Sequence, residues 1–166
     1  MLKHKKRNTI NRIIEENIDY LYRFAFYRVG NKEEAEDIVY EAILKCLEKM
    51  PSDIKAESVR LYLFRIVHNL CNDKYRTHRI EKELIETVEI IDDIIEVNEY
   101  EDFGKINKYL ENLEPHEADI IRMNVIDDLS FVEISKVLSI PQSTAKSRFK
   151  SGMDKLRKLF TDKQMS

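Results

Sequence analysis

The chain has 166 residues, 43% hydrophobic and 36% charged, which is the composition of a globular protein with one ordinary domain or two small ones. Three glycines and three prolines leave little material for hairpin turns, and the long helical periodicities predict an all-α fold. No apolar run approaches the roughly 18 residues of a membrane span, and the basic start MLKHKKR is not followed by a signal-peptide segment. We therefore expect a cytoplasmic protein without membrane insertion.

Two amphipathic helices are predicted first. Residues 10–29 form an aromatic-rich helix whose rings should mostly be buried, and Asn31 with Glu34 has the spacing of a capping box that starts a second helix over residues 32–50, before Pro51. The outer face of the second helix is acidic and is either a docking face or a solvated one. Its acids are Glu33, Asp37, Glu41 and Glu48.

A third helix is predicted over residues 59–79, and its polar side chains gather on one side. Six of them fall within about 100 degrees of arc at ideal helical pitch, opposite an apolar face, and two tyrosines flank them. Cations, amides and aromatic rings in this arrangement suit phosphates and unpaired bases, although a solvated surface helix fits the pattern equally well. The six are Arg65, His68, Asn69, Asn72, Arg76 and Arg79, and the tyrosines are Tyr62 and Tyr75.

The next segment, residues 81–104, carries ten acids against the single base Lys82, a local net charge of minus nine. Because the whole chain has a net charge of minus three, the remainder sums to plus six. This pattern predicts two mildly basic helical domains, residues 1–80 and 105–166, joined by an acidic linker.

Residues 129–148 predict a helix-turn-helix. Ser130 and Glu133 form a capping box that starts one helix at about Phe131, and Pro141 stops it and allows a second helix from about Gln142. The second helix has one apolar face, which we expect in the core. The residues of that face are Ala145, Phe149, Gly152, Met153, Leu156, Leu159 and Phe160.

The other face of this second helix carries short hydroxyl side chains and cations, which suit base edges and phosphates in a DNA groove. From Ile140 onward seven bases stand against two acids, which favours nucleic-acid binding over a helical hairpin whose polar face is only solvated. The candidate DNA-binding residues are Gln142, Ser143, Thr144, Lys146, Ser147, Arg148 and Lys150.

Taken together, the two domains resemble a sigma factor of bacterial RNA polymerase, of the extracytoplasmic-function type that keeps only sigma domains 2 and 4. The resemblance rests on LYRFAFYRVGNKEEAEDIVYEAIL and LYLFRIVHNLCNDKYR in the first domain, and on LEPHEADIIRM, LSFVEISKVLSIP and STAKSR in the second. It covers nearly the whole chain.

The resemblance implies roles for the candidate residues. Asp37 and Glu41 would bind core RNA polymerase, and the loop of residues 51–58 would hold a base flipped from the minus-ten element. The helix over residues 59–79 would contact that element as it melts, and the helix after Pro141 would read the minus-thirty-five element of promoter DNA. Proteins of this family often have an anti-sigma factor as a further partner.

Several positions depart from the family pattern. Tyr40 replaces a glutamine beside the acidic docking residues, and Tyr62 replaces a tryptophan. Asp127 and Asp128 occupy a turn that often includes glycine, and Ser139 replaces a glycine in the helix-turn-helix, so the backbone there must accept more strain.

Two other functions are considered beside a sigma factor. One is a free-standing helix-turn-helix regulator that binds palindromic half-sites without polymerase. The other is a helical interaction protein that does not bind DNA. We expect no enzyme, metal or cofactor, because no nucleophile with a paired base, phosphate-binding glycine loop or metal-ligand spacing is seen in the sequence. Cys46 and Cys71 are expected to be buried small hydrophobes.

Overall fold

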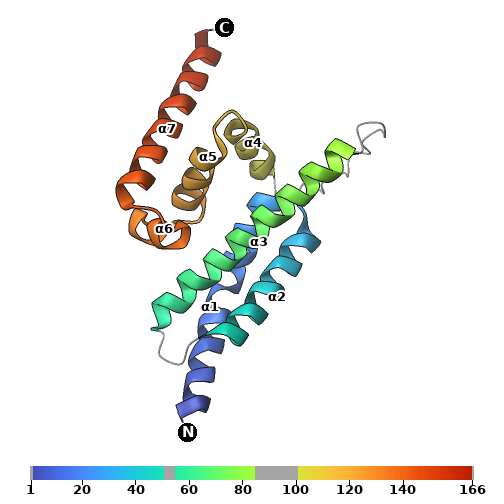
Figure 1. Cartoon of the computed structure of the whole chain (residues 1–166). Helices are drawn as coiled ribbons and strands as arrows, with labels where there is room; N and C mark the ends of the chain where they lie inside the picture. Colours follow the sequence, from blue (N-terminus) through green and yellow to red (C-terminus); the bar gives the residue numbers. More distant parts are fainter. Residues whose placement is uncertain (1, 51–54, 85–100, 166) are drawn as a thin grey trace. The chain divides into compact units, whose positions relative to one another are not determined.

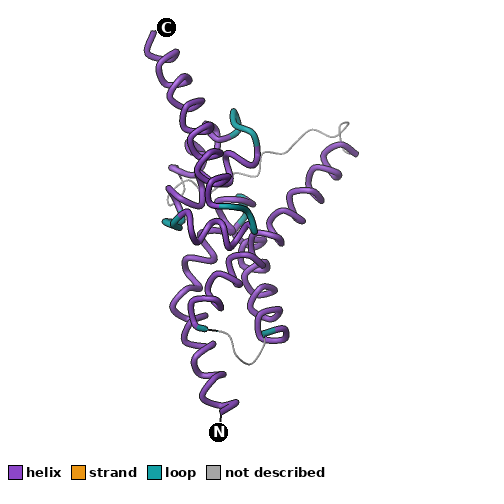
Figure 2. The backbone as a smooth tube through the Cα atoms, turned by 60° about the vertical axis from the view of Figure 1, so that its left-hand side comes forward, coloured by secondary structure: helices purple, strands orange, loops and turns teal. Residues whose placement is uncertain are grey.

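A computed structural model of the chain describes residues 2–50, 55–84 and 101–165, and every regular element in these ranges is helical (Figures 1 and 2). The predicted all-α fold is confirmed. The chain divides into two compact units, Met1–Ile90 and Ile91–Ser166. Among the described helices none is long and apolar enough to cross a membrane.

Unit 1 is a bundle of three helices, α1 (Leu2–Val29), α2 (Lys32–Lys49) and α3 (Ala56–Leu84), that pack against one another. Its centre is aromatic and aliphatic, with the rings of Phe24 and Phe64 in an edge-to-face contact at 5.2 Å. Cys46 and Cys71 are buried as expected, and burial raises the pKa of the Cys46 thiol to about 11. The bundle therefore holds α2 and α3 with one face of each directed outward.

Capping residues account for the start of α2. The side chain of Asn31 accepts a hydrogen bond from the amide of Glu34, while the Glu34 carboxylate lies 2.8 Å from Nε2 of His78 on α3. The cap predicted at Asn31 is thus present. The Glu34 side chain, which was expected to complete the capping box, contacts His78 and joins α2 to α3.

Helix lengths in the first half of the chain differ from the prediction. α1 begins eight residues before the predicted start at residue 10, and α3 continues to Leu84, into the segment assigned to the acidic linker. The sequence around residues 2 and 84 contains no capping box and no glycine or proline that would mark a helix end. Most of the expected linker, residues 85–100, and residues 51–54 of the loop expected to hold a flipped base lie outside the described residues.

Unit 2 comprises α4 (Glu101–Leu110), α5 (Pro115–Ile121), η1 (Arg122–Ile126), α6 (Phe131–Leu138) and α7 (Gln142–Met165). Side chains of α5 and α7 enclose a small hydrophobic core with the end of α4 and the turn that follows. This core contains Leu110, Leu113, Ala118 and Ile121, with Ile106, Phe149, Met153 and Leu156 packed against it.

The helix-turn-helix is formed by α6 and α7, with the boundaries predicted from the sequence. The Ser130 hydroxyl accepts the amide of Glu133, and the Glu133 carboxylate accepts the amide of Ser130. α6 ends at Ser139, whose backbone is left-handed with φ 55° and ψ 46°. The absence of glycine at this position is therefore accommodated by strain at a serine.

A π-helical turn, η1, connects α5 to the loop before α6. The amide of Asp127 donates to the Arg122 carbonyl at 3.0 Å, and the amide of Leu129 donates to the Met123 carbonyl at 2.9 Å. Asp128 is left-handed with φ 55°, in the turn where the family pattern often includes glycine. Asn124 closes this turn through a hydrogen bond from its side-chain amide to the Leu129 carbonyl.

Candidate nucleic-acid interfaces

The first half of α7 presents the polar face that the sequence predicts. Ala145 is fully buried on the opposite side, and the ring of Phe149 meets Phe131 of α6 edge to face at 5.3 Å. These contacts turn the candidate DNA-binding side chains outward. Thr144 and Arg148 are half-buried on one flank, and the exposed residues are Gln142, Ser143, Lys146, Ser147 and Lys150.

One apolar position of α7 differs from the prediction. Phe160 is 47% exposed, although it was expected in the core, and its ring packs on Tyr109 of α4 with 4.8 Å between the ring centroids. Phe160 lies near the end of α7, beyond the residues that enclose the hydrophobic core of unit 2. It therefore covers the end of α4 from outside.

The expected polar stripe is present on α3, with one exception. Arg65, Asn69, Asn72 and Arg76 are exposed, Tyr75 is 64% exposed and Tyr62 is half-buried. The exception is His68, which is 8% exposed. It lies at the margin of the arc, next to the buried positions of Phe64 and Cys71 one turn away on either side, so the bundle covers it. The side chain of Arg79 lies outside the described residues.

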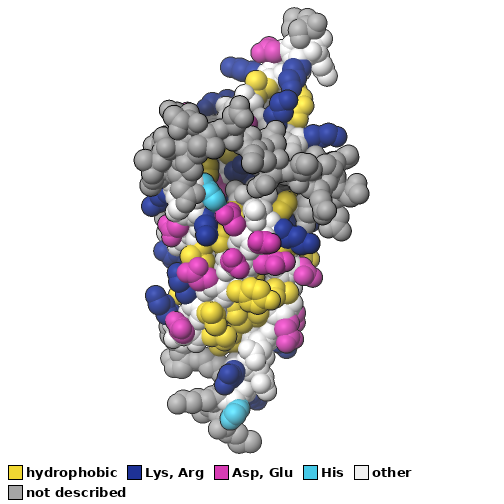
Figure 3. Space-filling view, turned by 90° about the vertical axis from the view of Figure 1, so that its right-hand side faces the viewer, with side chains coloured by type: hydrophobic (Ala, Val, Ile, Leu, Met, Phe, Trp, Pro, Cys, Tyr) yellow, Lys and Arg dark blue, Asp and Glu magenta, His cyan; other side chains and the backbone are white. Residues whose placement is uncertain are grey.

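The outer face of α2 contains a feature that the sequence reasoning missed. Asp37 and Glu41 are exposed as expected, but a column of exposed apolar side chains runs beside them. At about 100 degrees per residue, the acids and these apolar residues occupy adjacent arcs of the helix. Figure 3 shows hydrophobic side chains bordered by acidic ones on this side of the molecule. The apolar residues are Tyr40 (66% exposed), Leu44 (61%) and Leu47 (44%).

A signal for this column was present in the sequence. Tyr40, Leu44 and Leu47 have the spacing of four and three residues that marks an apolar stripe, but the buried stripe of the same helix has the same period. The bundle buries one of these two stripes and leaves the other exposed.

Within the described part of the chain no group of three or more His, Cys, Asp and Glu side chains is placed to hold a metal ion. The polar groups that gather on α3 and α7 are cations, amides and hydroxyls, which bind phosphates and base edges. The fold and these faces define a two-unit helical protein whose second unit ends in a helix-turn-helix.

Comparison with known proteins identifies both units. Residues 13–80 match Sigma-70 region 2, and residues 109–158 match Sigma-70, region 4. The chain is 28% identical over 164 residues to the ECF RNA polymerase sigma factor SigW of Bacillus subtilis, covering 90% of this chain and 88% of SigW. It is 27% identical over 147 residues to RNA polymerase sigma factor SigZ of the same organism, covering 84% of this chain and 80% of SigZ.

Solved structures share the fold. The sigma factor RpoE, in a complex with the anti-sigma factor NepR from Bartonella quintana, matches with a TM-score of 0.71 at 21% identity, covering 91% of this chain and 96% of RpoE. CnrH in complex with the cytosolic domain of CnrY matches with a TM-score of 0.66 at 18% identity, covering 92% of this chain and 88% of CnrH. The chain belongs to the sigma-70 family of RNA polymerase sigma factors, of the extracytoplasmic-function type, and directs promoter-specific transcription.

Proposed function

We propose that α7 reads the minus-thirty-five element, that α3 contacts the minus-ten element as it melts, and that the outer face of α2 binds core RNA polymerase. The exposed polar face of α7 carries this proposal, because its opposite face is buried against α6 and it carries cations beside short hydrogen-bonding side chains. In this assignment residues 1–80 form sigma domain 2, residues 81–104 the linker and residues 105–166 sigma domain 4.

Reconstitution with core polymerase tests the function. Specific transcription from a matching promoter, with little specific duplex binding by the free protein, is the expected result. Tight binding to palindromic DNA in the absence of polymerase would instead favour a free-standing regulator.

The role of α7 is tested with Arg148→Ala. If Arg148 holds a base, the variant relaxes specificity at one promoter position at a cost of roughly 1 to 3 kcal/mol. If it holds only phosphate, transcription falls uniformly across promoter sequences, and the loss depends strongly on salt. Transcription that is unchanged at every promoter and salt concentration would remove Arg148 from the interface.

The face of α3 supplies the second contact. In this proposal the exposed Arg65 and Arg76 would contact phosphates, Asn69 and Asn72 would contact the edges of extruded bases, and Tyr75 would stack beside them. Asn72→Ala is expected to lower transcription from a closed duplex promoter more than from a template that is already unpaired at the minus-ten element. Equal losses on both templates would argue against a role in melting.

The outer face of α2 suits a helical partner with an apolar stripe beside a basic one. Apolar side chains in a contact supply affinity, while acids at its rim supply charge complementarity. Leu44→Ala should weaken binding to core polymerase by about tenfold, as truncation of a central apolar contact does. Because Leu44 is exposed in the free protein, the substitution should not change the free energy of unfolding of the protein.

A matched control for this test is Ile18→Ala, which truncates an exposed apolar side chain on α1 of the same unit. Ile18→Ala is expected to leave polymerase affinity at the wild-type value. Equal losses in both variants would show that apolar exposure in general, and not the face of α2, determines binding.

An anti-sigma factor is a further partner in this proposal, since RpoE, which shares the fold, is solved in complex with the anti-sigma factor NepR. A pull-down from native cells should recover a protein that competes with core polymerase. Recovery of polymerase subunits alone would argue against it. We infer that the chain acts by binding and without catalysis, and that it acts in the cytoplasm with the polymerase.

A further inference from the structure

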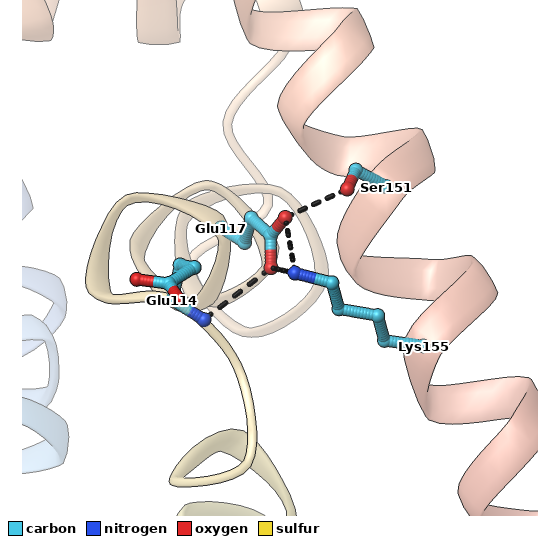
Figure 4. Close-up of polar contacts among 4 residues, drawn as sticks. All are labelled: Glu114, Glu117, Ser151 and Lys155. Atoms are coloured by element: carbon cyan, nitrogen blue, oxygen red, sulfur yellow. Dashed lines mark hydrogen bonds and ion pairs between the residues drawn. The ribbon is translucent and has the colours of Figure 1, made fainter.

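Unit 2 contains a buried carboxylate that joins α5 to α7, the recognition helix of the proposed function. Glu117, in the first turn of α5, is 4% exposed and accepts hydrogen bonds from two side chains of α7 (Figure 4). The Ser151 hydroxyl donates to Oε1 at 2.7 Å, and Nζ of Lys155 lies 2.9 Å from each carboxylate oxygen. The backbone amide of Glu114 donates to Oε2 at 3.3 Å. Both carboxylate oxygens thus have donors.

Gly152 allows the two helices to approach closely at this carboxylate. A Cβ atom at Gly152 would lie 2.7 Å from Cδ1 of Ile121 and 3.3 Å from Cβ of Glu117. The glycine follows Ser151 directly on α7 and is itself buried. A close approach of the backbones and a network of directional bonds therefore occur at the same point along α7.

The hydrogen bonds of Glu117 give the contact between α5 and α7 a directional component that the hydrophobic core beside it lacks. Burial of apolar surface is favourable but has no direction, so the packing of Ile121, Phe149 and Leu156 specifies the rotation of α7 less sharply than hydrogen bonds do. The ion pair joins a buried carboxylate to Lys155, whose side chain is 46% exposed, so it adds little net stability, but its hydrogen bonds have a preferred geometry. Glu117 thereby fixes the rotation of α7 about its own axis.

A rotation of α7 about its axis would also move the candidate DNA-binding side chains in the first half of this helix. Ser147 and Lys150 lie within one turn of Ser151 on the same continuous helix, so they rotate with it. Side chains near the helix surface lie about 5 to 6 Å from the axis, and a rotation of about 20 degrees moves them by about 2 Å. A hydrogen bond to a base edge does not survive that displacement.

We propose that Glu117 is a positioning residue for promoter recognition: it holds the recognition helix at the rotation that its DNA-facing side chains require, without contacting DNA. This inference rests on the proposed role of α7 at the minus-thirty-five element. Ser151 and Lys155 act in the same way, through Glu117.

The test is transcription by reconstituted holoenzyme from a promoter that the wild-type protein uses, and from versions with single-base changes in the minus-thirty-five element. The quantity measured is the ratio of transcription from the intact promoter to that from each altered promoter. Loss of folded protein lowers transcription from all promoters by the same factor and leaves this ratio unchanged. Rotation of α7 changes it.

Glu117→Gln is expected to lower the ratio by about threefold or more, because a rotated α7 loses part of its discrimination against a wrong base pair. Removing an acid beside a DNA-binding helix would, by charge alone, strengthen binding to DNA, so positioning and bulk charge predict opposite changes in affinity. Ser151→Ala, which keeps the ion pair, should give a smaller loss in the same direction.

The control is Glu111→Gln, which neutralises an exposed carboxylate in the same unit and should leave the ratio at the wild-type value. If the wild-type protein shows no dependence on the minus-thirty-five element, the proposed role of α7 fails. If that dependence is present but Glu117→Gln and Ser151→Ala both retain the wild-type ratio, the positioning role of Glu117 is wrong and the role of α7 stands. If Glu117→Gln does not fold, the promoter ratio of Ser151→Ala alone decides whether the positioning role of Glu117 is correct.

Discussion

Ser139 ends α6 in a left-handed conformation that costs a side-chain-bearing residue roughly 1 to 2 kcal/mol and a glycine almost nothing. Ser139→Gly should therefore raise the free energy of unfolding of unit 2. The gain should be about 0.5 to 1 kcal/mol, because glycine also gains freedom in the unfolded chain. Urea denaturation followed by a probe in unit 2 measures the change.

Asp128 provides the comparison, since it has the same φ of 55°. Aspartate tolerates the left-handed region better than serine, so Asp128→Gly should give a smaller gain than Ser139→Gly. A lower stability for Ser139→Gly would mean that the serine side chain contributes more than its backbone strain costs.

Glu117 also gives unit 2 a dependence on pH. Hydrogen bonds from Ser151 and Lys155 outweigh burial and hold the pKa of the carboxyl below its ordinary value of 4.5. A lowered pKa in the folded state means that the folded chain releases the proton more readily than the unfolded chain does. Its contribution to stability is thus complete above pH 4.5 and is lost as the pH falls through the lowered pKa.

Thermal unfolding of unit 2 between neutral and acid pH measures this contribution. The wild-type protein should lose stability more steeply than Glu117→Gln below pH 4.5, because glutamine does not titrate. Identical slopes for the two proteins would assign the acid sensitivity to other carboxylates.

At the scale of elements, the contact between α5 and α7 depends on the missing Cβ of Gly152 and on the Cδ1 atom of Ile121 that occupies its place. Gly152→Ala adds helix propensity of about 1 kcal/mol but forces Ile121 to move. Ile121→Val removes that Cδ1 atom. Gly152→Ala should therefore be more favourable in the Ile121→Val background than alone, with a coupling energy of about 0.5 kcal/mol or more in a double-mutant cycle.

Additive effects of the two substitutions would contradict this packing. The pair Gly152→Ala with Val132→Ala is a control, since Val132 is an exposed side chain on α6 and has no place in the contact. Those two changes should add.

The helix boundaries that the sequence predicted well are those with a chemical signal in the chain itself. Ser130 with Glu133, Asn31 and Pro141 each satisfy or remove particular backbone amides, so the starts of α2, α6 and α7 follow from local residues. The start of α1 and the end of α3 have no such signal and were misplaced. The residues of the α7 face were predicted because one clear apolar stripe opposes them.

Burial at the margin of a helical face could not be predicted in the same way. His68 and Phe160 occupy positions whose exposure depends on which neighbouring helix reaches them, and that is a property of the packed unit. The exposed column of Tyr40 and Leu44 was missed for the same reason, because period alone does not say which of two apolar stripes meets the bundle. Residues at the centre of a face were therefore predicted correctly, and residues at its margin were not.

At the scale of the whole molecule, the described residues form two compact units, each with buried side chains of its own. We expect the units to open separately. Leu63→Ala removes a fully buried side chain of unit 1 and should destabilise that unit by about 2 to 5 kcal/mol. Hydrogen exchange should then accelerate in α1, α2 and α3 and stay at the wild-type rate in α5, α6 and α7.

The reciprocal change is Ile134→Val in α6, where the native side chain is also fully buried. It should cost about 0.5 to 1.5 kcal/mol and accelerate exchange in unit 2 alone. Faster exchange throughout the chain after either substitution would mean that the two units unfold as one.

The π-helical turn η1 has a consequence for how the length of this chain can vary. Each hydrogen-bonded loop of a π-helix contains one residue more than an α-helical loop, and that residue is stored between Arg122 and Ile126. Deleting the exposed Val125 would let the segment close as an ordinary α-helix, and later positions would keep nearly the same angle relative to α5, because one π-helical turn takes up about one residue more than one α-helical turn. The chain can therefore lose one residue at this turn without rotating the helix-turn-helix relative to the start of α5.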